Sequence, residues 1–172
     1  MNIEIRQASG NEDLLAAARL FSEYTEMLTA HDPSVQDYLE LQHYEDELRD
    51  LNQKYGPPWG RLCLAYCEGK AAGCAALRRL SAESCEMKRF YVRPAFRGNH
   101  IGRLLIESLT DSARKIGYSH MLLDTLPFLS HAIQLYRDFG FYEIPRYNDS
   151  PVEGTLFMQL DLNGSLEKPA FP

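Results

Sequence analysis

The alternation of apolar and polar residues along the chain predicts where its strands and helices lie. Residues 3–8 alternate and predict a half-buried first strand. The segment that follows has a helical period, which is visible in its apolar positions: Leu14, Leu15, Ala18, Phe21 and Leu28. A second helix is predicted from about Gln36 to Gln53, and Gly56-Pro57-Pro58 ends it, because proline cannot continue a helix.

The middle of the chain predicts three strands and a long helix. The strands are expected at residues 61–67, 72–79 and 85–92. Glu68-Gly69-Lys70 joins the first two and is a hairpin signal. A strongly amphipathic helix is predicted over 101–116, and Gly117 follows it where a helix end favours a residue that tolerates positive φ.

The last third of the chain predicts a short buried strand, a helix and two further strands. They are expected at residues 121–123, 130–138, 141–144 and 155–162. The resulting order, βααββ-βαβαββ, is typical of a single α/β (mixed α+β) domain in which helices cover both faces of a mixed central sheet. We expect this domain over residues 1–162 and a frayed C-terminal tail over 163–172.

Composition does not name a function, but it narrows the class of protein. The 172 residues suffice for one domain with a real core, and the net charge of −6 argues against a nucleic-acid partner, which would favour a basic surface. The N-terminus lacks the features of a signal peptide. No apolar run approaches the roughly 20 residues that span a bilayer. We therefore expect a cytoplasmic protein without membrane contact.

All four cysteines fall in predicted strands: Cys63, Cys67, Cys74 and Cys85. We expect reduced thiols in the core, because structural disulfides are rare in the cytosol. No pair of histidines or cysteines has the short spacing of a structural zinc site, so no metal is expected.

The sequence Arg97-Gly98-Asn99-His100-Ile101-Gly102 lies between a predicted strand and the long helix. The first N–H groups of a helix have no internal partner and the helix dipole is positive there, so such a loop suits a pyrophosphate. Basic residues flank the loop: Lys88, Arg89, Arg93, Arg103, Arg114 and Lys115. Taken alone, the segment is also consistent with a plain strand-to-helix turn that carries a solvated basic face.

Two motifs make the chain similar to a known family. Residues 90–105, Phe-Tyr-Val-Arg-Pro-Ala-Phe-Arg-Gly-Asn-His-Ile-Gly-Arg-Leu-Leu, resemble the acetyl-CoA-binding motif of the GNAT superfamily of N-acetyltransferases. That motif has the form Arg/Gln-x-x-Gly-x-Gly/Ala between a strand and a helix. Residues 132–141, Ala-Ile-Gln-Leu-Tyr-Arg-Asp-Phe-Gly-Phe, resemble the second signature of the family. The order and separation of the two motifs, and the order of predicted elements, match the family as well.

The resemblance implies an enzyme that moves an acetyl group from acetyl-CoA to a primary amine of a small molecule or peptide. It also implies which positions contact acetyl-CoA: Phe90, Tyr91, Val92, Arg97, Gly98, Asn99, His100, Ile101, Gly102, Arg103, Ala132 and Tyr136. Direct attack by the amine is expected, with the acetyl carbonyl held by a backbone N–H in the region 90–92, where a preorganised donor contributes most.

The chain departs from the family pattern at two positions. Leu129 stands where many members have an asparagine, and His100 replaces the first glycine of the loop motif. A side chain at position 100 requires either a negative φ or a left-handed conformation, which histidine tolerates moderately well. His100 could weaken cofactor binding, touch a phosphate, or have little effect as an exposed residue.

Tyr136 occupies the family's position for the general acid that protonates the leaving thiolate. A phenol suits this step because its ordinary pKa, near 10, is close to that of a thiol. The alternative is a core tyrosine that completes the packing around it.

The amine must lose a proton before it attacks, and Glu86 is the candidate base. Two other carboxylates remain as candidates for this role: Glu83 and Asp124. Period-two alternation places Glu86 and Lys88 on one face of their strand. Met87 and Arg89 then lie on the other face. Glu86 could point into the cleft or form a structural ion pair.

The first two helices usually cover the acceptor site in proteins of this kind. Here they carry many acidic residues: Glu12, Asp13, Glu23, Glu26, Asp32, Asp37, Glu40, Glu45, Asp46, Glu47 and Asp50. Such an acidic surface would attract a cationic amine, although solvated helix faces explain the charges as well.

Two alternative functions stay open: transfer of a different acyl group, and a non-catalytic sensor that binds acyl-CoA. Family members often dimerise, so a second copy of the chain is a further candidate partner.

Overall fold

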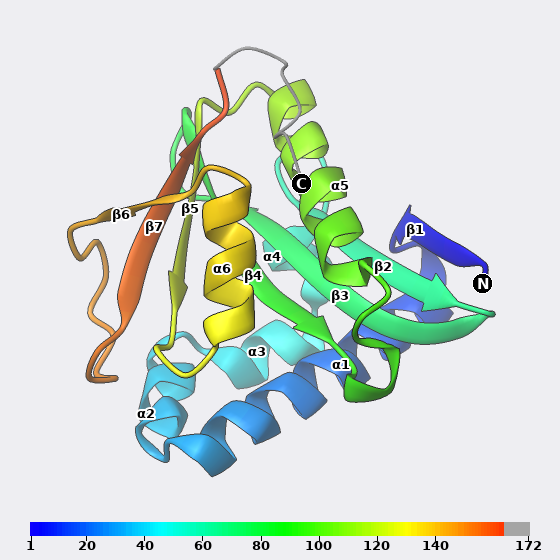
Figure 1. Cartoon of the computed structure of the whole chain (residues 1–172), viewed down its shortest axis with the longest axis horizontal. Helices are drawn as coiled ribbons and strands as arrows, with labels where there is room; N and C mark the ends of the chain where they lie inside the picture. The colour runs from blue at the N-terminus through cyan, green and yellow to red at the C-terminus, as the bar shows by residue number, and fades with distance from the viewer. Residues whose placement is uncertain (164–172) are drawn as a thin grey trace.

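A seven-stranded sheet forms the centre of the protein in the computed structural model, which describes residues 1–163 (Figure 1). The strand order is β1-β2-β3-β4-β5-β7-β6. The strands are β1 (Ile3–Gln7), β2 (Arg61–Cys67), β3 (Lys70–Arg79), β4 (Ser84–Val92), β5 (His120–Thr125), β6 (Tyr142–Ile144) and β7 (Leu156–Asp161). Neighbouring strands are antiparallel except β4 and β5, which are parallel. The expected mixed sheet is confirmed, whereas the tail expected over 163–172 lies, apart from Asn163, outside the described residues.

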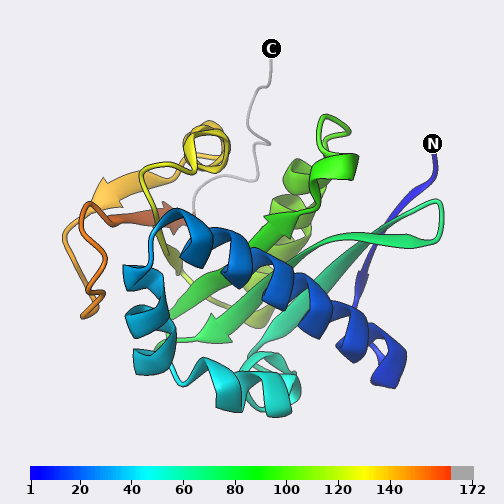
Figure 2. The ribbon, with the colours of Figure 1, turned by 90° about the horizontal axis from the view of Figure 1, so that it is seen from below.

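Helices cover both faces of the sheet (Figure 2). One face carries α1 (Gly10–His31), α2 (Ser34–Leu41), α3 (Tyr44–Arg49) and α4 (Leu51–Tyr55). The other face carries α5 (Ile101–Ile116) and α6 (Ser130–Asp138), and a 3₁₀ turn, Pro94–Phe96, precedes α5. Each layer has its own apolar core, one around Phe21 and Leu64 and the other around Leu105 and Met121. Of the apolar positions that predicted α1, Phe21 and Leu28 are buried and Leu14 and Ala18 are half-buried, whereas Leu15 is 60% exposed, so the prediction is wrong there. The amphipathic helix predicted over 101–116 is confirmed as α5.

The single helix predicted from Gln36 to Gln53 is wrong, because three short helices occupy that region. His43 has a φ of 56°, a left-handed conformation that ends the helical path after α2. Asp50 then leaves the helical region, and its side chain caps α4 by accepting a hydrogen bond from the backbone N–H of Gln53 at 3.2 Å. The chain thereby curves around one end of the sheet instead of crossing it in a straight line.

A β-bulge in β4 changes which side chains face the helices α1–α4. The register with β3 shifts between the pairs Cys74–Tyr91 and Ala76–Lys88, and Arg89 has a φ of 58°. Glu86 and Lys88 share a face, as predicted. The prediction that Arg89 lies on the opposite face is wrong, because the extra residue of the bulge turns its side chain to the face of Lys88.

The parallel strands β4 and β5 pair over only part of their length. Their paired residues are Ser84 with His120, Cys85 with Met121 and Glu86 with Leu122. Beyond Glu86 the two strands diverge toward α1 and α2, which leaves one edge of β4 without a strand partner (Figure 1). The gap between them is the feature around which the candidate site is built.

The four cysteines are free and buried, which confirms their prediction as core residues. Within residues 1–163, no helix has the length and apolar content required to cross a membrane.

Candidate functional site

The loop before α5 presents a row of backbone donors. Gly98 and His100 both have positive φ values, 82° and 60°. The N–H groups of residues 98–102 form no hydrogen bond with any described part of the chain. Since they lie at the positive end of the α5 dipole, they suit an anion. His100 takes the left-handed of the two conformations open to it, and its side chain is exposed and does not cap the helix.

The loop passes close to the end of β4. A Cβ atom added at Gly102 would lie 3.0 Å from the ring carbon Cζ of Phe90, so any larger residue there would push the ring away by a few tenths of an ångström. Arg97 donates from Nε to the carbonyl oxygen of Val92 at 3.1 Å and leaves the rest of its guanidinium exposed. The loop donors and the unpaired edge of β4 therefore form one continuous surface.

A small cavity of about 50 Å³ lies in the gap between β4 and β5. Tyr136 of α6 lines it and is 5% exposed, with its ring 5.8 Å from that of Phe90 and 5.7 Å from that of Phe141. Its hydroxyl forms no hydrogen bond with residues 1–163. Burial raises the pKa of Tyr136 well above the ordinary value. The phenol is therefore protonated at neutral pH and free to donate.

Asp124, at the end of β5, lines the same cavity. Its Oδ2 accepts hydrogen bonds from the Tyr38 hydroxyl and, at 2.7 Å, from Nδ2 of Asn148. Burial raises the pKa of Asp124, but the charge of Lys88 and these hydrogen bonds outweigh it, so the pKa lies below the ordinary value. Oδ1 has no hydrogen-bond partner among the described residues. Asp124 is thus an ionised carboxylate with one oxygen available.

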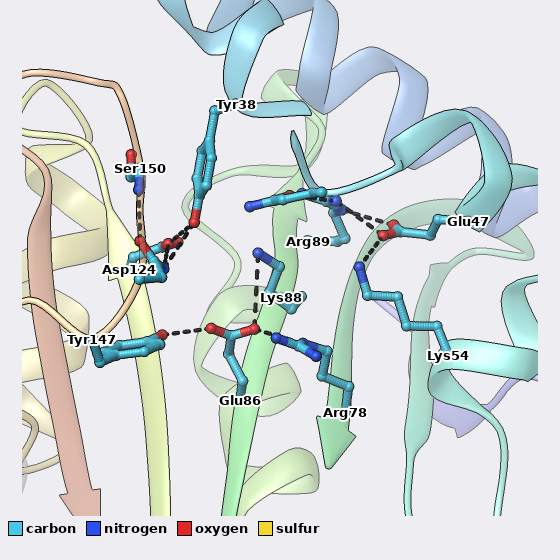
Figure 3. A network of polar contacts seen from close by, with 12 residues as sticks. Tyr38, Glu47, Lys54, Arg78, Glu86, Lys88, Arg89, Asp124, Tyr147 and Ser150 are labelled. Atoms are coloured by element: carbon cyan, nitrogen blue, oxygen red, sulfur yellow. Dashed lines mark hydrogen bonds and ion pairs between the residues drawn. The ribbon is translucent and has the colours of Figure 1, made fainter. Parts of the chain in front are cut away.

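A larger cleft of about 700 Å³ adjoins this cavity and is bounded by α2–α4, β4 and the segment before β7. Glu86 lines it and is almost completely buried. Figure 3 shows how it is held: Nε of Arg78 lies 2.7 Å away, the Tyr147 hydroxyl 2.6 Å away and Nζ of Lys88 3.9 Å away. Each carboxylate oxygen of Glu86 therefore already accepts a hydrogen bond.

A buried ion pair between Arg89 of β4 and Glu47 of α3 lies beside the cleft. Arg89 donates from Nε and Nη2 to Glu47 at 2.8 and 3.0 Å, and Lys54 donates to Glu47 at 2.6 Å (Figure 3). Burial raises the pKa of Glu47, but its two cationic neighbours outweigh burial and lower that pKa to about 2. The bidentate contact fixes α3 against the bulge of β4.

The structure brings together some of the residues singled out in the sequence and separates others. Tyr136, Asp124 and Phe90 meet at one cavity, while Glu86 lines the neighbouring cleft. Glu83 is exposed before β4 and lines neither space. The expected loop positions lie together: Arg97, Gly98, Asn99, His100, Ile101, Gly102 and Arg103. Ala132 of α6 packs against the core that α5 also covers, and Leu129 precedes α6 without capping it through its side chain.

Sequence reasoning missed Tyr147 and Asn148, which bind Glu86 and Asp124 from the segment between β6 and β7. Neither residue belongs to a motif or to a periodic pattern. The only signal in the sequence is a short polar stretch between two strands. It predicts a loop, but not which residues of the sheet that loop contacts.

Comparisons with known proteins agree with this geometry. Residues 17–141 match the model of the Acetyltransferase (GNAT) family. An uncharacterized N-acetyltransferase of Schizosaccharomyces pombe is 40% identical over 138 residues, which cover 75% of this chain and 85% of that protein. An IAA acetyltransferase of Azospirillum brasilense is 36% identical over 122 residues, which cover 68% and 77%. The crystal structure of the PaiA N-acetyltransferase of Thermoplasma acidophilum in complex with coenzyme A superposes with a TM-score of 0.72 at 20% identity, covering 94% of this chain and 99% of that one.

Proposed function

Because the chain belongs to the acetyltransferase (GNAT) family, whose members carry out acetyl-CoA-dependent acyl transfer, we propose that it acetylates a primary amine of a small molecule or peptide. One observation supports this most strongly. A buried proton donor, Tyr136, and an ionised carboxylate, Asp124, line the same cavity beside the open edge of β4. Direct transfer from a thioester to an amine needs both groups in one place.

The residues present fit acetyl-CoA. The free N–H groups of residues 98–102 suit the pyrophosphate, with Arg97 and Arg103 on either side of them. The unpaired edge of β4, residues 87–92, offers main-chain groups to an extended ligand in the manner of an added strand. When bound, acetyl-CoA supplies an activated acetyl carbonyl and a thiol leaving group.

Two side chains of the cavity transfer the protons of the reaction: one accepts a proton from the amine and the other donates a proton to the leaving thiolate. Asp124 takes one proton from the incoming ammonium through its free Oδ1, which leaves a neutral amine able to attack the carbonyl carbon. As the new C–N bond forms and the C–S bond breaks, the Tyr136 hydroxyl gives its proton to the sulfur. The nitrogen gives its second proton to the phenolate, which restores the phenol, and Asp124 releases its proton to water, which restores the carboxylate. We favour Asp124 over Glu86 as the base because Glu86 is already held by Arg78 and Tyr147.

The proposal is tested by measuring thiol release from acetyl-CoA with a panel of amines, and by comparing Asp124→Asn with Glu86→Gln. We expect Asp124→Asn to lower kcat by about 10²-fold to 10⁴-fold, the usual contribution of a positioned base. Glu86→Gln should lower it much less. Melting temperatures of both variants serve as the control for folding.

Two results would count against this assignment. If Glu86→Gln keeps its fold and loses turnover while Asp124→Asn stays active, Glu86 is the base. If the protein binds CoA but no amine releases thiol, the chain is a sensor and not an enzyme.

His100 provides a separate prediction about the loop. Because a left-handed conformation costs a non-glycine residue about 1–2 kcal/mol, His100→Gly should stabilise the fold by up to about 1 kcal/mol once the greater freedom of glycine in the unfolded chain is subtracted. His100→Ala, which keeps the backbone cost and removes the imidazole, is the matched variant. Urea denaturation measures the stability, and calorimetry measures CoA affinity, which both variants should retain within a few-fold. A clear loss of affinity in both variants would instead place the imidazole on a phosphate.

A further inference from the structure

Lys88 is a buried cation that forms no side-chain hydrogen bond with the described part of the chain. Its side chain is 6% exposed, and its ammonium donates to none of residues 1–163 within hydrogen-bond distance. The nearest carboxylate oxygen, Oε1 of Glu86, is 3.9 Å away, and the Tyr38 ring centroid is 5.7 Å away. A buried ammonium is normally hydrogen-bonded as well as paired, because removing it from water is costly. Lys88 thus has donors left for a group that enters the cleft.

Arg78 approaches the same carboxylate oxygen of Glu86, Oε1, as Lys88 does, and Tyr147 lies at the other oxygen (Figure 3). Only its Nε is engaged, by Glu86, while its terminal Nη groups have no partner within the described chain and line the cleft. Glu86 accepts hydrogen bonds only from Nε of Arg78 and from the Tyr147 hydroxyl among the described residues, so neither the Lys88 ammonium nor the Nη groups of Arg78 are satisfied by it.

The inner wall of the cleft and cavity carries more positive than negative charge. The cations are Lys54, Arg78, Lys88 and Arg89, and the buried or half-buried carboxylates are Glu47, Glu86 and Asp124. Burial lowers the pKa of Lys54 to about 8, and the nearby charges of Arg89 and Lys88 lower it as well, although Glu47 opposes them. Three further acidic residues line the cleft and are exposed to solvent, which screens their charges: Asp46, Asp50 and Asp149. A ligand that carries an anionic group would complete the inner charge balance.

The position of Lys88 limits how far this anionic group lies from the reacting nitrogen. Lys88 lines both the small cavity, which Tyr136 and Asp124 also line, and the larger cleft. A group bound to its ammonium therefore sits at the junction of the two spaces, a few bonds from an amine that enters the cavity.

We infer that the acceptor is a free amino acid, whose carboxylate binds the Lys88 ammonium and the terminal Nη groups of Arg78. A carboxylate matches the planar guanidinium and accepts charge-assisted hydrogen bonds from both cations. The amino group then points toward Asp124, and the side chain of the acceptor occupies the rest of the cleft. This inference rests on the proposed function, since it names the class of amine that the same site acetylates.

The test compares each common L-amino acid with its carboxamide and with its decarboxylated amine, using thiol release from acetyl-CoA. We expect at least one amino acid to be acetylated with a kcat/KM at least tenfold above those of its two analogues. Lys88→Gln should abolish that preference by lowering the value for the amino acid at least tenfold more than the values for the two analogues. Lys115→Gln, at an exposed lysine near the end of α5, is the matched control and should retain the preference.

Calorimetric titration of the same compounds into the CoA-saturated protein separates failure of this inference from failure of the proposed function. If amines lacking a carboxylate are acetylated as well as amino acids, or if Lys88→Gln keeps the preference, the inference is overturned and the enzyme stands. If no compound releases thiol but amino acids bind in a Lys88-dependent manner, the inference stands and the proposed reaction fails. If no amino acid either binds or reacts, the inference is overturned.

Discussion

Replacing Tyr136 by phenylalanine is expected to lower kcat by about 10²-fold to 10⁴-fold while the affinity for CoA stays within a few-fold, because the change removes one proton donor and little volume. The hydroxyl lies in the cavity between β4 and β5 without a hydrogen-bond partner among residues 1–163. Its removal therefore breaks no hydrogen bond within the fold. Single-turnover thiol release and calorimetry with CoA measure the two quantities separately.

The matched control for this change is Tyr142→Phe. The Tyr142 hydroxyl donates to Asp161 at 2.8 Å on the exposed side of β6 and β7 and lines neither the cavity nor the cleft. It should have no effect on turnover. Unchanged turnover in Tyr136→Phe would contradict the acid role and leave Tyr136 as a core residue packed between Phe90 and Phe141.

The pH profile gives a second check on Tyr136. Burial raises the pKa of its phenol well above the ordinary value near 10. The acid form is therefore present across the neutral and moderately alkaline range. An activity that falls between pH 8 and 10 must then be due to another group.

Much of the fold could be predicted from the sequence because the patterns that define it are local. The helical period of residues 101–116 and the strand-forming runs at 61–67 and 72–79 depend only on neighbours along the chain, and the structure confirms a helix and two strands at these places. The loop at 97–102 could be predicted for the same reason, since free donors at the start of a helix follow from the helix itself.

The deviations from these patterns depend on contacts between distant residues. Alternation placed Arg89 on the wrong face of β4, because nothing in residues 85–92 reveals the bulge that the Glu47 carboxylate stabilises from 42 positions away. The break at His43 is equally hidden, since a helical period continues through it. Asn148 reaches Asp124 from a loop whose course depends on the finished sheet. These features determine the shape of the acceptor cleft, so the sequence identifies the cofactor loop more readily than the acceptor.

Replacing Glu47 by alanine is expected to destabilise the fold by about 3–5 kcal/mol, the usual effect of leaving a buried charge without its partner. The Arg89 side chain is 5% exposed, and Glu47 accepts two of its hydrogen bonds. Without that carboxylate the guanidinium retains one hydrogen bond to the described residues, which it donates to the side-chain oxygen of Gln42 at 2.9 Å, and its contact with the Tyr44 ring 5.0 Å away. Lys54 loses its ion pair as well. The free energy of unfolding is measured by urea denaturation. Glu45→Ala, on the exposed side of the same helix, is the control and should change stability by less than about 0.5 kcal/mol.

The ion pair also predicts how stability depends on acid. Arg89 and Lys54 outweigh burial and lower the pKa of Glu47 to about 2, from an ordinary value of 4.5. A carboxyl whose pKa is depressed in the folded state stabilises the fold fully above its unfolded pKa, and that contribution disappears as the pH falls through the folded pKa. The shift corresponds to about 3 kcal/mol, which should be lost between pH 4.5 and pH 2. In Glu47→Gln this component is absent, so the difference in unfolding free energy between the natural chain and the variant should narrow as the pH falls across that window. A difference that stays constant from pH 5 to pH 2 would show that Glu47 contributes through packing and neutral hydrogen bonds and not through its charge.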